Sequence, residues 1–377
     1  MKKALFIFGT RPEAIKMAPI INKFKKDKNN FRTLVAVTAQ HREMLDQVLS
    51  LFKIIPDYDL NIMKPNQSLE DLTSRILIKV SALLNQIRPD ILFVQGDTTT
   101  TYASALASFY KKIPIAHIEA GLRTKNIHSP FPEEVNRRMT TITSSYHFPP
   151  TEKSKNNLLN EGVSKKNITI SGNTVIDALM YISKKIDLKR ERIENYFFKN
   201  FSILFDNKKT ILITGHRREN FGEGFENICQ SVKEIAKKKD VQIIYPVHLN
   251  PNVQEPVYRI LKEIDNIYLI PPQNYEPFIF LMKKSYIILT DSGGIQEEAP
   301  SLGKPVLVLR DTTERPEGID AGTAKLVGTD KNNIISNLEV LLENSNEYDK
   351  MSKAVNPYGL GNASEKIHEF VKKNIIN

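Results

Sequence analysis

Charged side chains follow short apolar runs at several points, in positions where they could bind anions or move protons. The first group is Gly9-Thr10-Arg11-Pro12-Glu13, which comes directly after Leu5–Phe8, with Lys16 nearby. Gly9 would permit a tight turn, Arg11 would offer a planar fork of donors, and Lys16 would add a second charge. This combination suits an anion at the start of a helix, although a turn with exposed charges is the alternative.

The same pattern recurs roughly 200 residues later as Gly215-His216-Arg217-Arg218-Glu219, a domain-sized spacing rather than a short repeat. The recurrence favours the anion-binding interpretation in both places. His216 adds a side chain that can exchange protons near neutral pH. A lone histidine is more often structural, but the position of His216 directly after a strand favours a function, whereas His248 could simply belong to a loop.

Three carboxylates in the first half of the chain could perform acid–base chemistry. Asp97 and Glu119 each follow a short apolar run, and Glu133 comes after two prolines at the start of a predicted helix. Each has a structural alternative, because Asp is a favoured helix cap and first-turn carboxylates complement the helix dipole. Convergence on one cleft would suit removal and return of a proton. A metal site that also used His117 lacks HExxH or His/Cys spacing, so we expect no metal.

The most specific local signal is Thr290-Asp291-Ser292-Gly293-Gly294, where a strand ends and a helix begins. The two glycines would let backbone N–H groups approach phosphate oxygens closely. Glu298 could accept hydrogen bonds from ribose hydroxyls, and Arg315 offers a further cation after the next strand. A plain strand–helix turn is the alternative. Neither GxGxxG nor GxxxxGK[ST] is present, so the sequence indicates neither NAD nor ATP.

These groups depend on an alternation of short strands and longer helices. Helical periodicity is clearest where Ser68 and Asp71 form a predicted cap before an apolar stripe that runs from Leu69 to Ile87. Strand–helix alternation implies parallel sheets covered by helices, so the fold class is α/β. The expected strands are Leu5–Phe8, Thr33–Val37, Ile91–Val94, Ile113–Ile118, Ile168–Ile170, Ile211–Thr214, Val241–Tyr245, Ile287–Thr290 and Val306–Leu309.

Composition limits the class of protein. The 377 residues suffice for two or perhaps three domains, with 41% hydrophobic and 25% charged residues. The net charge of +10 is spread over scattered lysines without interleaved aromatics, so we expect no nucleic-acid partner. Cys229 is the single cysteine, which fits a reducing, cytoplasmic environment. No apolar run approaches the roughly 18 residues that cross a membrane, so we expect no membrane partner.

The motifs predict two Rossmann-like doubly wound domains that face a cleft. We place the domains at residues 1–172 and 173–360, with a C-terminal helix in 361–377 that packs back on the first. The charged, irregular stretch Lys184–Asn200 is typical of a domain junction. A ligand would bind in the cleft, outside the carboxyl ends of both sheets.

Taken together and in order, the motifs resemble those of the non-hydrolysing UDP-N-acetylglucosamine 2-epimerases over nearly the whole chain. Any one motif would be weak, but the ordered set is highly specific. The resemblance implies a glycosyltransferase-B-type fold, a homodimer and no nicotinamide cofactor. The shared segments are Phe8–Glu13, Thr38–Arg42, Gln95–Thr98, His117–Arg123, Pro132–Glu134, Gly215–Glu219, Thr290–Gly294 and Arg310–Pro316.

The resemblance also implies a reaction. UDP-N-acetylglucosamine and UDP-N-acetylmannosamine (UDP-ManNAc) would interconvert through elimination of UDP to 2-acetamidoglucal and its re-addition, supplying ManNAc units for cell-surface polysaccharide. Asp97, Glu119 and Glu133 would be the acid–base residues, and which of them takes the C2 proton stays open. His216 would assist at the sugar–diphosphate linkage.

By the same resemblance, substrate contacts can be assigned to individual residues. An allosteric second UDP-sugar would use Gln40, His41 and Arg42, although Asn66 stands where some relatives carry arginine. The expected substrate contacts are Arg11, Lys16, Ser292, Gly293 and Gly294 for the diphosphate, Glu298 and Arg315 for ribose and phosphate, and Gln273 and Phe278 for uracil.

Three other functions remain open at this point. A UDP-sugar-dependent glycosyltransferase could use the same fold but would need an acceptor site. A hydrolysing 2-epimerase would release free ManNAc and UDP. A nucleotide-sugar-binding regulator would bind UDP without turnover.

Overall fold

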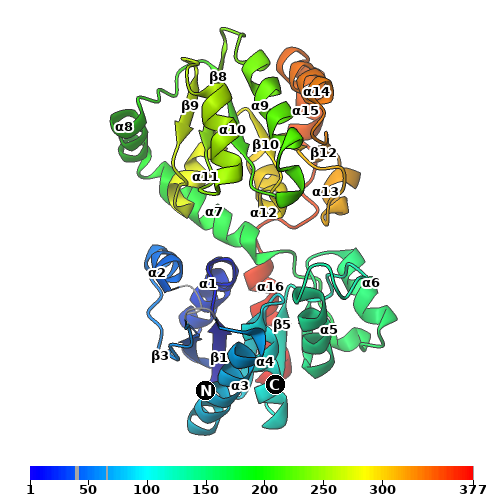
Figure 1. Ribbon diagram of the computed structural model, residues 1–377. Coiled ribbons are helices and arrows are strands. Elements are labelled where there is room, and N and C mark those ends of the chain that lie inside the picture. Colours follow the sequence, from blue (N-terminus) through cyan, green and yellow to red (C-terminus); the bar gives the residue numbers. More distant parts are fainter. Residues whose placement is uncertain (39–41, 65–66, 377) are drawn as a thin grey trace. The chain divides into compact units, whose positions relative to one another are not determined.

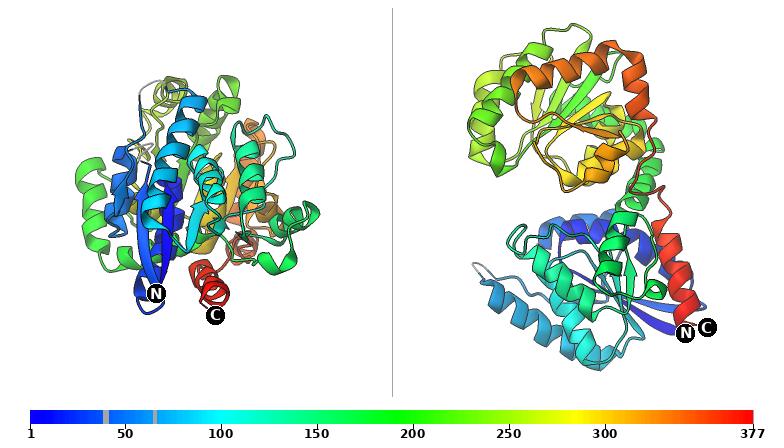
Figure 2. Two further views of the ribbon diagram at one scale, coloured as in Figure 1. Left: turned by 90° about the horizontal axis from the view of Figure 1, so that it is seen from below. Right: turned by 90° about the vertical axis from the view of Figure 1, so that its right-hand side faces the viewer.

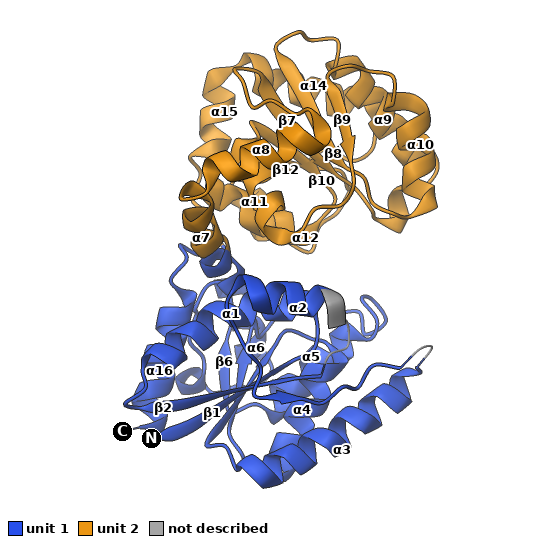
Figure 3. Ribbon diagram, turned by 90° about the vertical axis from the view of Figure 1, so that its left-hand side faces the viewer, with its two compact units in different colours: residues 1–178, 358–377 blue, residues 179–357 orange. Residues whose placement is uncertain are grey.

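The computed structural model describes residues 1–38, 42–64 and 67–376. Its contacts divide the chain into two compact units (Figure 3). Unit 1 comprises residues 1–178 and 358–377, and unit 2 comprises residues 179–357. The chain passes from unit 1 to unit 2 within helix α7 (Thr174–Asp187). Each unit is a parallel sheet with helices along its faces (Figure 1).

The sheet of unit 1 has the strand order β3-β2-β1-β4-β5-β6, and every neighbouring pair is parallel. The crossover direction changes between β1 and β4, which is the switch point where doubly wound folds bind ligands. The strands are β1 Lys2–Phe8, β2 Phe31–Val37, β3 Tyr58–Asp59, β4 Ile91–Gln95, β5 Ile115–Ile118 and β6 Tyr146–Phe148.

Helices pack on both faces of this sheet because successive side chains of its central strands alternate between the faces. Leu5 and Ile7 belong to an apolar cluster with residues of α3 and α4. Phe6 lies on the other face, where its ring meets that of Phe24 in α1 at 5.5 Å. The helices are α1 Arg11–Lys26, α2 Arg42–Leu51, α3 Leu69–Ile87, α4 Thr99–Tyr110, α5 Glu133–Thr143, α6 Glu152–Asn160, the 3₁₀ turn Lys165–Asn167, and α16 Ala363–Ile375.

Unit 2 repeats the same topology. Its sheet has the order β12-β11-β10-β7-β8-β9. If β7 is counted as the first strand and the sheet is read from its other edge, this is the strand order of unit 1. The switch point therefore lies between β7 and β10, which pair in parallel. The strands are β7 Lys209–Thr214, β8 Val241–Pro246, β9 Ile267–Ile270, β10 Ile287–Thr290, β11 Val306–Val308 and β12 Ala324–Leu326.

The core of unit 2 is also divided between two faces. Ile211 and Ile213 of β7 pack with apolar residues of α9, α10 and α14. Elsewhere in the unit, the ring of Phe197 in α8 stacks on that of Phe280 in α11 at 5.6 Å. The helices are α8 Arg190–Phe201, the 3₁₀ turn Arg218–Asn220, α9 Glu223–Ile235, α10 Pro251–Leu261, α11 Tyr275–Lys284, α12 Gly293–Glu298, the 3₁₀ turn Ala299–Leu302, α13 Pro316–Asp320, α14 Lys331–Glu343 and α15 Ser345–Ser352.

The C-terminal helix α16 belongs to unit 1, so both chain termini lie on that unit (Figure 2). Asp177 caps it by accepting hydrogen bonds from the N–H groups of Ala363 at 3.1 Å and Ser364 at 2.8 Å. His368 then contacts Asp27, at the end of α1, at 3.0 Å. The cap thus joins α16 to α7, and the His368–Asp27 contact joins it to the end of α1, against which it packs.

Three sequence predictions differ from the structure. Ile168–Ile170 forms no strand, because only an isolated bridge joins Ile168 to His147. Leu69 begins the predicted stripe of α3 but is 40% exposed, since it is the first residue of the helix and the buried stripe begins at Leu72. The charged stretch Lys184–Asn200 is largely helical, in α7 and α8. In the described part of the chain, no helix combines the length and apolarity needed to cross a bilayer.

Candidate active site

Four of the motifs that carry chemistry lie at the two switch points. In unit 1, β1 ends before Gly9 and the neighbouring β4 ends before Asp97. In unit 2, β7 ends before Gly215 and the neighbouring β10 ends before Asp291. Each unit therefore presents two polar turns side by side at the carboxyl edge of its sheet.

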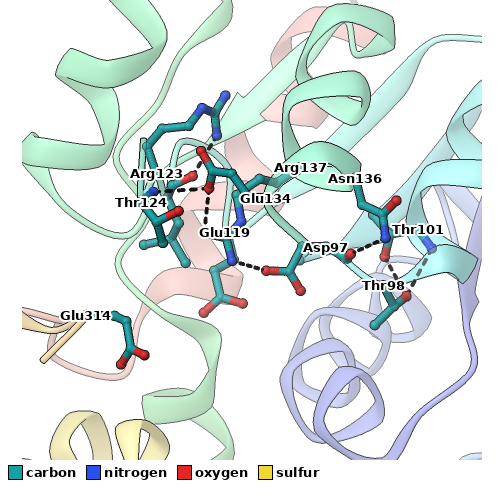
Figure 4. Close-up of polar contacts among 12 residues, drawn as sticks. Asp97, Thr98, Thr101, Glu119, Arg123, Thr124, Glu134, Asn136, Arg137 and Glu314 are labelled. Carbon is teal, nitrogen blue, oxygen red and sulfur yellow. Dashed lines mark hydrogen bonds and ion pairs between the residues drawn. The ribbon is translucent and has the colours of Figure 1, made fainter. Parts of the chain in front are cut away.

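A buried carboxylate joins the two turns of unit 1. One oxygen of Glu13 accepts hydrogen bonds from the N–H groups of Gly9 at 3.0 Å and Thr10 at 2.7 Å. Its other oxygen accepts from the hydroxyls of Thr98 at 2.7 Å and Thr101 at 3.1 Å (Figure 4 labels both threonines). Burial raises the pKa of Glu13, and these donated hydrogen bonds oppose the rise. Glu13 is therefore a support for the turns.

Gly9 is required for close packing. A Cβ atom at this position would lie 2.0 Å from Oγ1 of Thr38 and 2.8 Å from Oγ1 of Thr100. Any residue larger than glycine would collide with these side chains. Close packing is therefore the main reason for Gly9, and the tight turn expected from the sequence is a secondary one. Arg11 is half-buried at the first position of α1, where its anion-binding role remains a prediction.

Glu119 lies at the end of β5 in a cradle of donors. Nζ of Lys16 is 2.6 and 2.7 Å from its two oxygens, Gln95 donates from β4, and Asn173 donates at 3.1 Å. The residue is 9% exposed and has a φ of 62°, in the left-handed region. Lys16, which the resemblance assigned to the diphosphate, here neutralises a catalytic candidate.

Asp97 is held from α5 (Figure 4). Its carboxylate meets Nη2 of Arg137 at 2.5 Å, and its backbone carbonyl accepts a hydrogen bond from Asn136 at 2.9 Å. Arg137 also contacts Glu134 at 3.2 Å, so one guanidinium joins the two carboxylates. The side chain of Asp97 is 26% exposed. Asp97 can therefore meet a ligand while its charge is balanced.

The adjacent residues Glu133 and Glu134 differ in burial and in partners. Glu134 is fully buried and accepts hydrogen bonds from the N–H of Thr124 at 3.0 Å and from Arg138 at 3.0 Å. Burial alone would raise the pKa of Glu134, but Thr124 and the two arginines hold it below the ordinary value. Glu133 is half-buried, and among the described residues its carboxylate has no hydrogen-bond or ion-pair partner. The structural role that the sequence offered as the alternative for first-turn carboxylates therefore fits Glu134.

The structure brings two of the three proposed acid–base residues to neighbouring strand ends. β4 and β5 are adjacent and parallel, with Gln95 opposite Ile118, so Asp97 and Glu119 follow the same edge of the sheet. Helix α5, which begins at Glu133, packs against α4 and β5. Because β4 and β5 are neighbours, the first two carboxylates follow adjacent strands at this edge.

His117 is a buried support. Its Nε2 lies 2.8 Å from the carbonyl oxygen of Gly96, which can only accept, so Nε2 carries the proton. Burial lowers the pKa of His117 to about 3. Across the described residues, no three His, Cys, Asp or Glu side chains are placed to hold a metal ion.

In unit 2 the joining carboxylate comes from the other turn. Asp291, at the end of β10, accepts hydrogen bonds from the N–H groups of His216 and Arg217, both at 2.8 Å. Its second oxygen is 3.1 Å from Nδ1 of His216. Burial alone would raise the pKa of Asp291, but these contacts hold it below the ordinary value. The counterpart of Glu13 in the repeated motif, Glu219, is 50% exposed and contacts Arg310 instead.

This arrangement orients the imidazole of His216. Nδ1 lies at ion-pair distance from Oδ1 of Asp291, an oxygen without a hydrogen-bond partner among the described residues, and the side chain is 41% exposed, so the ring can reach a ligand. The ring of His248 stacks on it at 5.6 Å. A carboxylate–histidine pair of this kind fixes the ring for proton transfer or for binding an anion.

Beside His216, the glycine turn leaves its backbone accessible. A Cβ atom on Gly293 would meet no protein atom within 4 Å, and one on Gly294 would meet only Oγ of Ser292, at 4.0 Å. The N–H of Ser292 is held by the hydroxyl of Thr290 at 3.0 Å. The open space at these glycines is compatible with close approach of a phosphate.

The remaining predicted contacts are already engaged by side chains of unit 2. Glu298 accepts a hydrogen bond from the hydroxyl of Tyr275 at 2.6 Å, and Arg315 pairs with the buried Glu297. The amide of Gln273 accepts from the hydroxyl of Tyr196 at 3.2 Å. These contacts pre-orient groups for ribose, phosphate or uracil, which remain predicted roles.

Phe278, also assigned to uracil, is half-buried in the first turn of α11. Of the predicted allosteric group, Gln40 and His41 lie outside the described residues, as does Asn66. Arg42 begins α2.

Sequence reasoning missed three residues that hold the carboxylates. Arg137 and Asn173 carry no motif of their own, and Gln95 begins the segment Gln95–Thr98 but has no role assigned from the sequence. The turn Ser171-Gly172-Asn173 before a helical pattern was the available signal for Asn173, since Asn favours such turns. What it contacts depends on the tertiary fold.

The chain matches known proteins over nearly its whole length. The family model described as UDP-N-acetylglucosamine 2-epimerase matches residues 23–372. The UDP-N-acetylglucosamine 2-epimerase of Escherichia coli strain K12 is 56% identical over 376 residues, covering 100% of both chains.

Two solved structures show the same fold. The crystal structure of the Neisseria meningitidis UDP-GlcNAc 2-epimerase bound to UDP-GlcNAc aligns with a TM-score of 0.89 at 56% identity, covering 99% of this chain and 100% of that one. The Methanocaldococcus jannaschii enzyme in complex with UDP-GlcNAc and UDP aligns at 0.80 and 35% identity, covering 98% and 99%. The expected glycosyltransferase-B-type fold is confirmed. The chain belongs to the UDP-N-acetylglucosamine 2-epimerase family.

Proposed function

We propose that this chain inverts C2 of the sugar in UDP-N-acetylglucosamine and thereby interconverts it with UDP-N-acetylmannosamine. The C2 proton is not next to a carbonyl group, so direct removal would leave an unstabilised carbanion. In the proposed path, UDP leaves C1 as a proton leaves C2, which gives 2-acetamidoglucal and free UDP. Re-addition of UDP to C1 and of a proton to the opposite face of C2 completes the inversion.

The observation that carries this proposal is the pair Asp97 and Glu119 on neighbouring strand ends, each beside a cation. Two carboxylates in different surroundings suit a reaction in which one group removes a proton and another returns it. Glu133 is a third candidate because it is half-buried. Which of them takes the C2 proton is left for experiment.

A second requirement is retention of UDP between the two half-reactions. In our proposal Ser292, Gly293 and Gly294 bind the diphosphate together with Arg11, and His216 assists at the bond between sugar and diphosphate. The open backbone at Gly293 and the orientation of His216 by Asp291 support these roles. Glu298 and Arg315 would contact ribose and phosphate, and Gln273 and Phe278 would contact uracil.

Incubation with UDP-N-acetylglucosamine in deuterated water tests the function directly. We expect UDP-N-acetylmannosamine with deuterium at C2, detected by NMR and mass spectrometry. Free N-acetylmannosamine with UDP would instead identify a hydrolysing enzyme. An unchanged sugar nucleotide that still binds would favour a regulator and refute the proposal.

A further inference from the structure

Asn173 contacts the carboxylate of Glu119 just before α7 begins. Its Nδ2 donates to Oε1 of Glu119 at 3.1 Å, and Asn173 itself is 3% exposed. Its Oδ1 accepts the N–H of Val175 at 3.0 Å. Because a backbone N–H can only donate, the amide must turn its oxygen toward Val175 and its NH₂ group toward Glu119.

The backbone of Asn173 is held by a segment that is distant in sequence. Its N–H donates to the carbonyl of Tyr358 at 2.7 Å. Gly172 and Gly359 both have positive φ, 87° and 118°, and a Cβ atom on Gly172 would lie 3.1 Å from the oxygen of Tyr358 and 3.4 Å from Cα of Gly359. The two segments can approach this closely because both positions are glycine.

Glu119 needs such support. A non-glycine residue in the left-handed region is uncommon and persists only where its surroundings enforce it. Lys16 supplies charge from a flexible side chain, whereas the amide of Asn173 supplies one directed donor from a fixed backbone. Lys16 therefore balances the charge of the carboxylate, whereas Asn173 offers it a donor in one fixed direction.

We propose that Asn173 is a positioning residue, which fixes the orientation of the Glu119 carboxylate for proton transfer at C2. The inference rests on the acid–base role proposed above for Glu119. Asn173 acts through Glu119 and is assigned no contact with the substrate.

Two substitutions at this position separate positioning from simple structural support. In Asn173→Asp the shape and the acceptor for Val175 are kept, but a charged oxygen replaces the donor facing Glu119. In Asn173→Ser the hydroxyl can still accept from Val175 but does not reach Glu119, and no charge is added. A purely structural residue predicts a lower melting temperature with kcat near wild type in the variants that fold, whereas a positioning donor predicts a loss of kcat that is larger for Asp than for Ser.

We expect kcat to fall about 10-fold for Asn173→Ser and about 100-fold for Asn173→Asp, with KM for UDP-N-acetylglucosamine within about threefold of wild type. Ser171→Ala is the matched control. It removes the bond from Ser171 to the carbonyl of Gly172 at 2.8 Å, in the same segment, without touching Glu119. It should keep wild-type kcat.

Wild-type kcat in Asn173→Asp, or a smaller loss than in Asn173→Ser, would overturn the inference. So would an equal loss of kcat in Ser171→Ala. Thermal unfolding of each variant checks folding, and if Asn173→Asp does not fold, the kcat of Asn173→Ser against Ser171→Ala decides. An inactive wild-type protein would refute the proposed function itself, so the two failures are distinguishable.

Discussion

The ammonium group of Lys16 lies 2.6 and 2.7 Å from the two carboxylate oxygens of Glu119. The side chains are only 16% and 7% exposed, so solvent screens this ion pair weakly. A lysine that sequence reasoning directs at a diphosphate thus belongs, in the structure, to the surroundings of an acid–base candidate.

Replacement of Lys16 tests which of these roles dominates. In Lys16→Met the charge is lost and the apolar length is kept, so we expect kcat to fall by about 10²–10⁴-fold, while calorimetric affinity for UDP stays within about threefold. Lys23→Met is the control, because Lys23 lies on the same helix as Lys16 but forms a partly exposed ion pair with Glu365 of α16, so kcat should stay unchanged. If Lys16→Met loses affinity for UDP as well as kcat, Lys16 binds the diphosphate, as the resemblance implies.

Asp97→Asn should stop turnover without loss of nucleotide binding. The substitution removes the carboxylate that faces Arg137, and we expect kcat to fall by at least about 10³-fold. Asp90→Asn is the matched control, since Asp90 lies at the opposite end of β4 and caps the N–H of Lys3 at 2.7 Å. Asp90→Asn should lower the stability of the protein and keep wild-type kcat. An active Asp97→Asn enzyme would remove Asp97 from the acid–base group.

Gly293→Ala should separate ligand contact from folding. Because a Cβ atom there meets no protein atom within 4 Å, we expect an unchanged or slightly raised melting temperature. The affinity for UDP, measured by calorimetry, should fall at least about tenfold if phosphate approaches the backbone here. Gly224→Ala serves as control, since its Cβ would make ordinary contacts at 3.4 Å and 3.6 Å with Thr329 and Asn220. Equal UDP affinity in both variants would exclude the phosphate contact.

Buried histidines should make the protein sensitive to mild acid. Burial lowers the pKa of His147 to about 4, and the unfolded chain binds this proton near pH 6.5. Between these values the unfolded state holds more protons, so stability falls as pH falls, by about 2 kcal/mol from His147 alone at pH 5. In His147→Gln the loss of urea stability between pH 7.5 and pH 5 should shrink by that amount.

His128→Gln, which removes an exposed imidazole, is the control for this measurement. It should show the same pH dependence of stability as the wild type. An unchanged pH dependence in His147→Gln would mean that His147 has the same pKa in the folded and unfolded states, which would contradict the effect of burial.

The strands that sequence reasoning did not predict are the edges of the two sheets. β3 and β6 border one sheet, and β9 and β12 border the other. Edge strands have a neighbour on one side only, and three of these four are two or three residues long. Central strands are buried on both faces and therefore carry the continuous apolar runs that a sequence reveals.

The sequence alone determined the alternation of strands and helices, the repeat of the topology, and the polar turns after the strands. Those features depend on local residue order, because periodicity and turn chemistry act over a few positions. Only the tertiary structure decided which carboxylates are supports and which can meet a ligand. Glu13 is held by Thr98, 85 residues away, and Glu119 by Lys16, 103 residues away. Burial and partners at such separations arise only when the sheet forms.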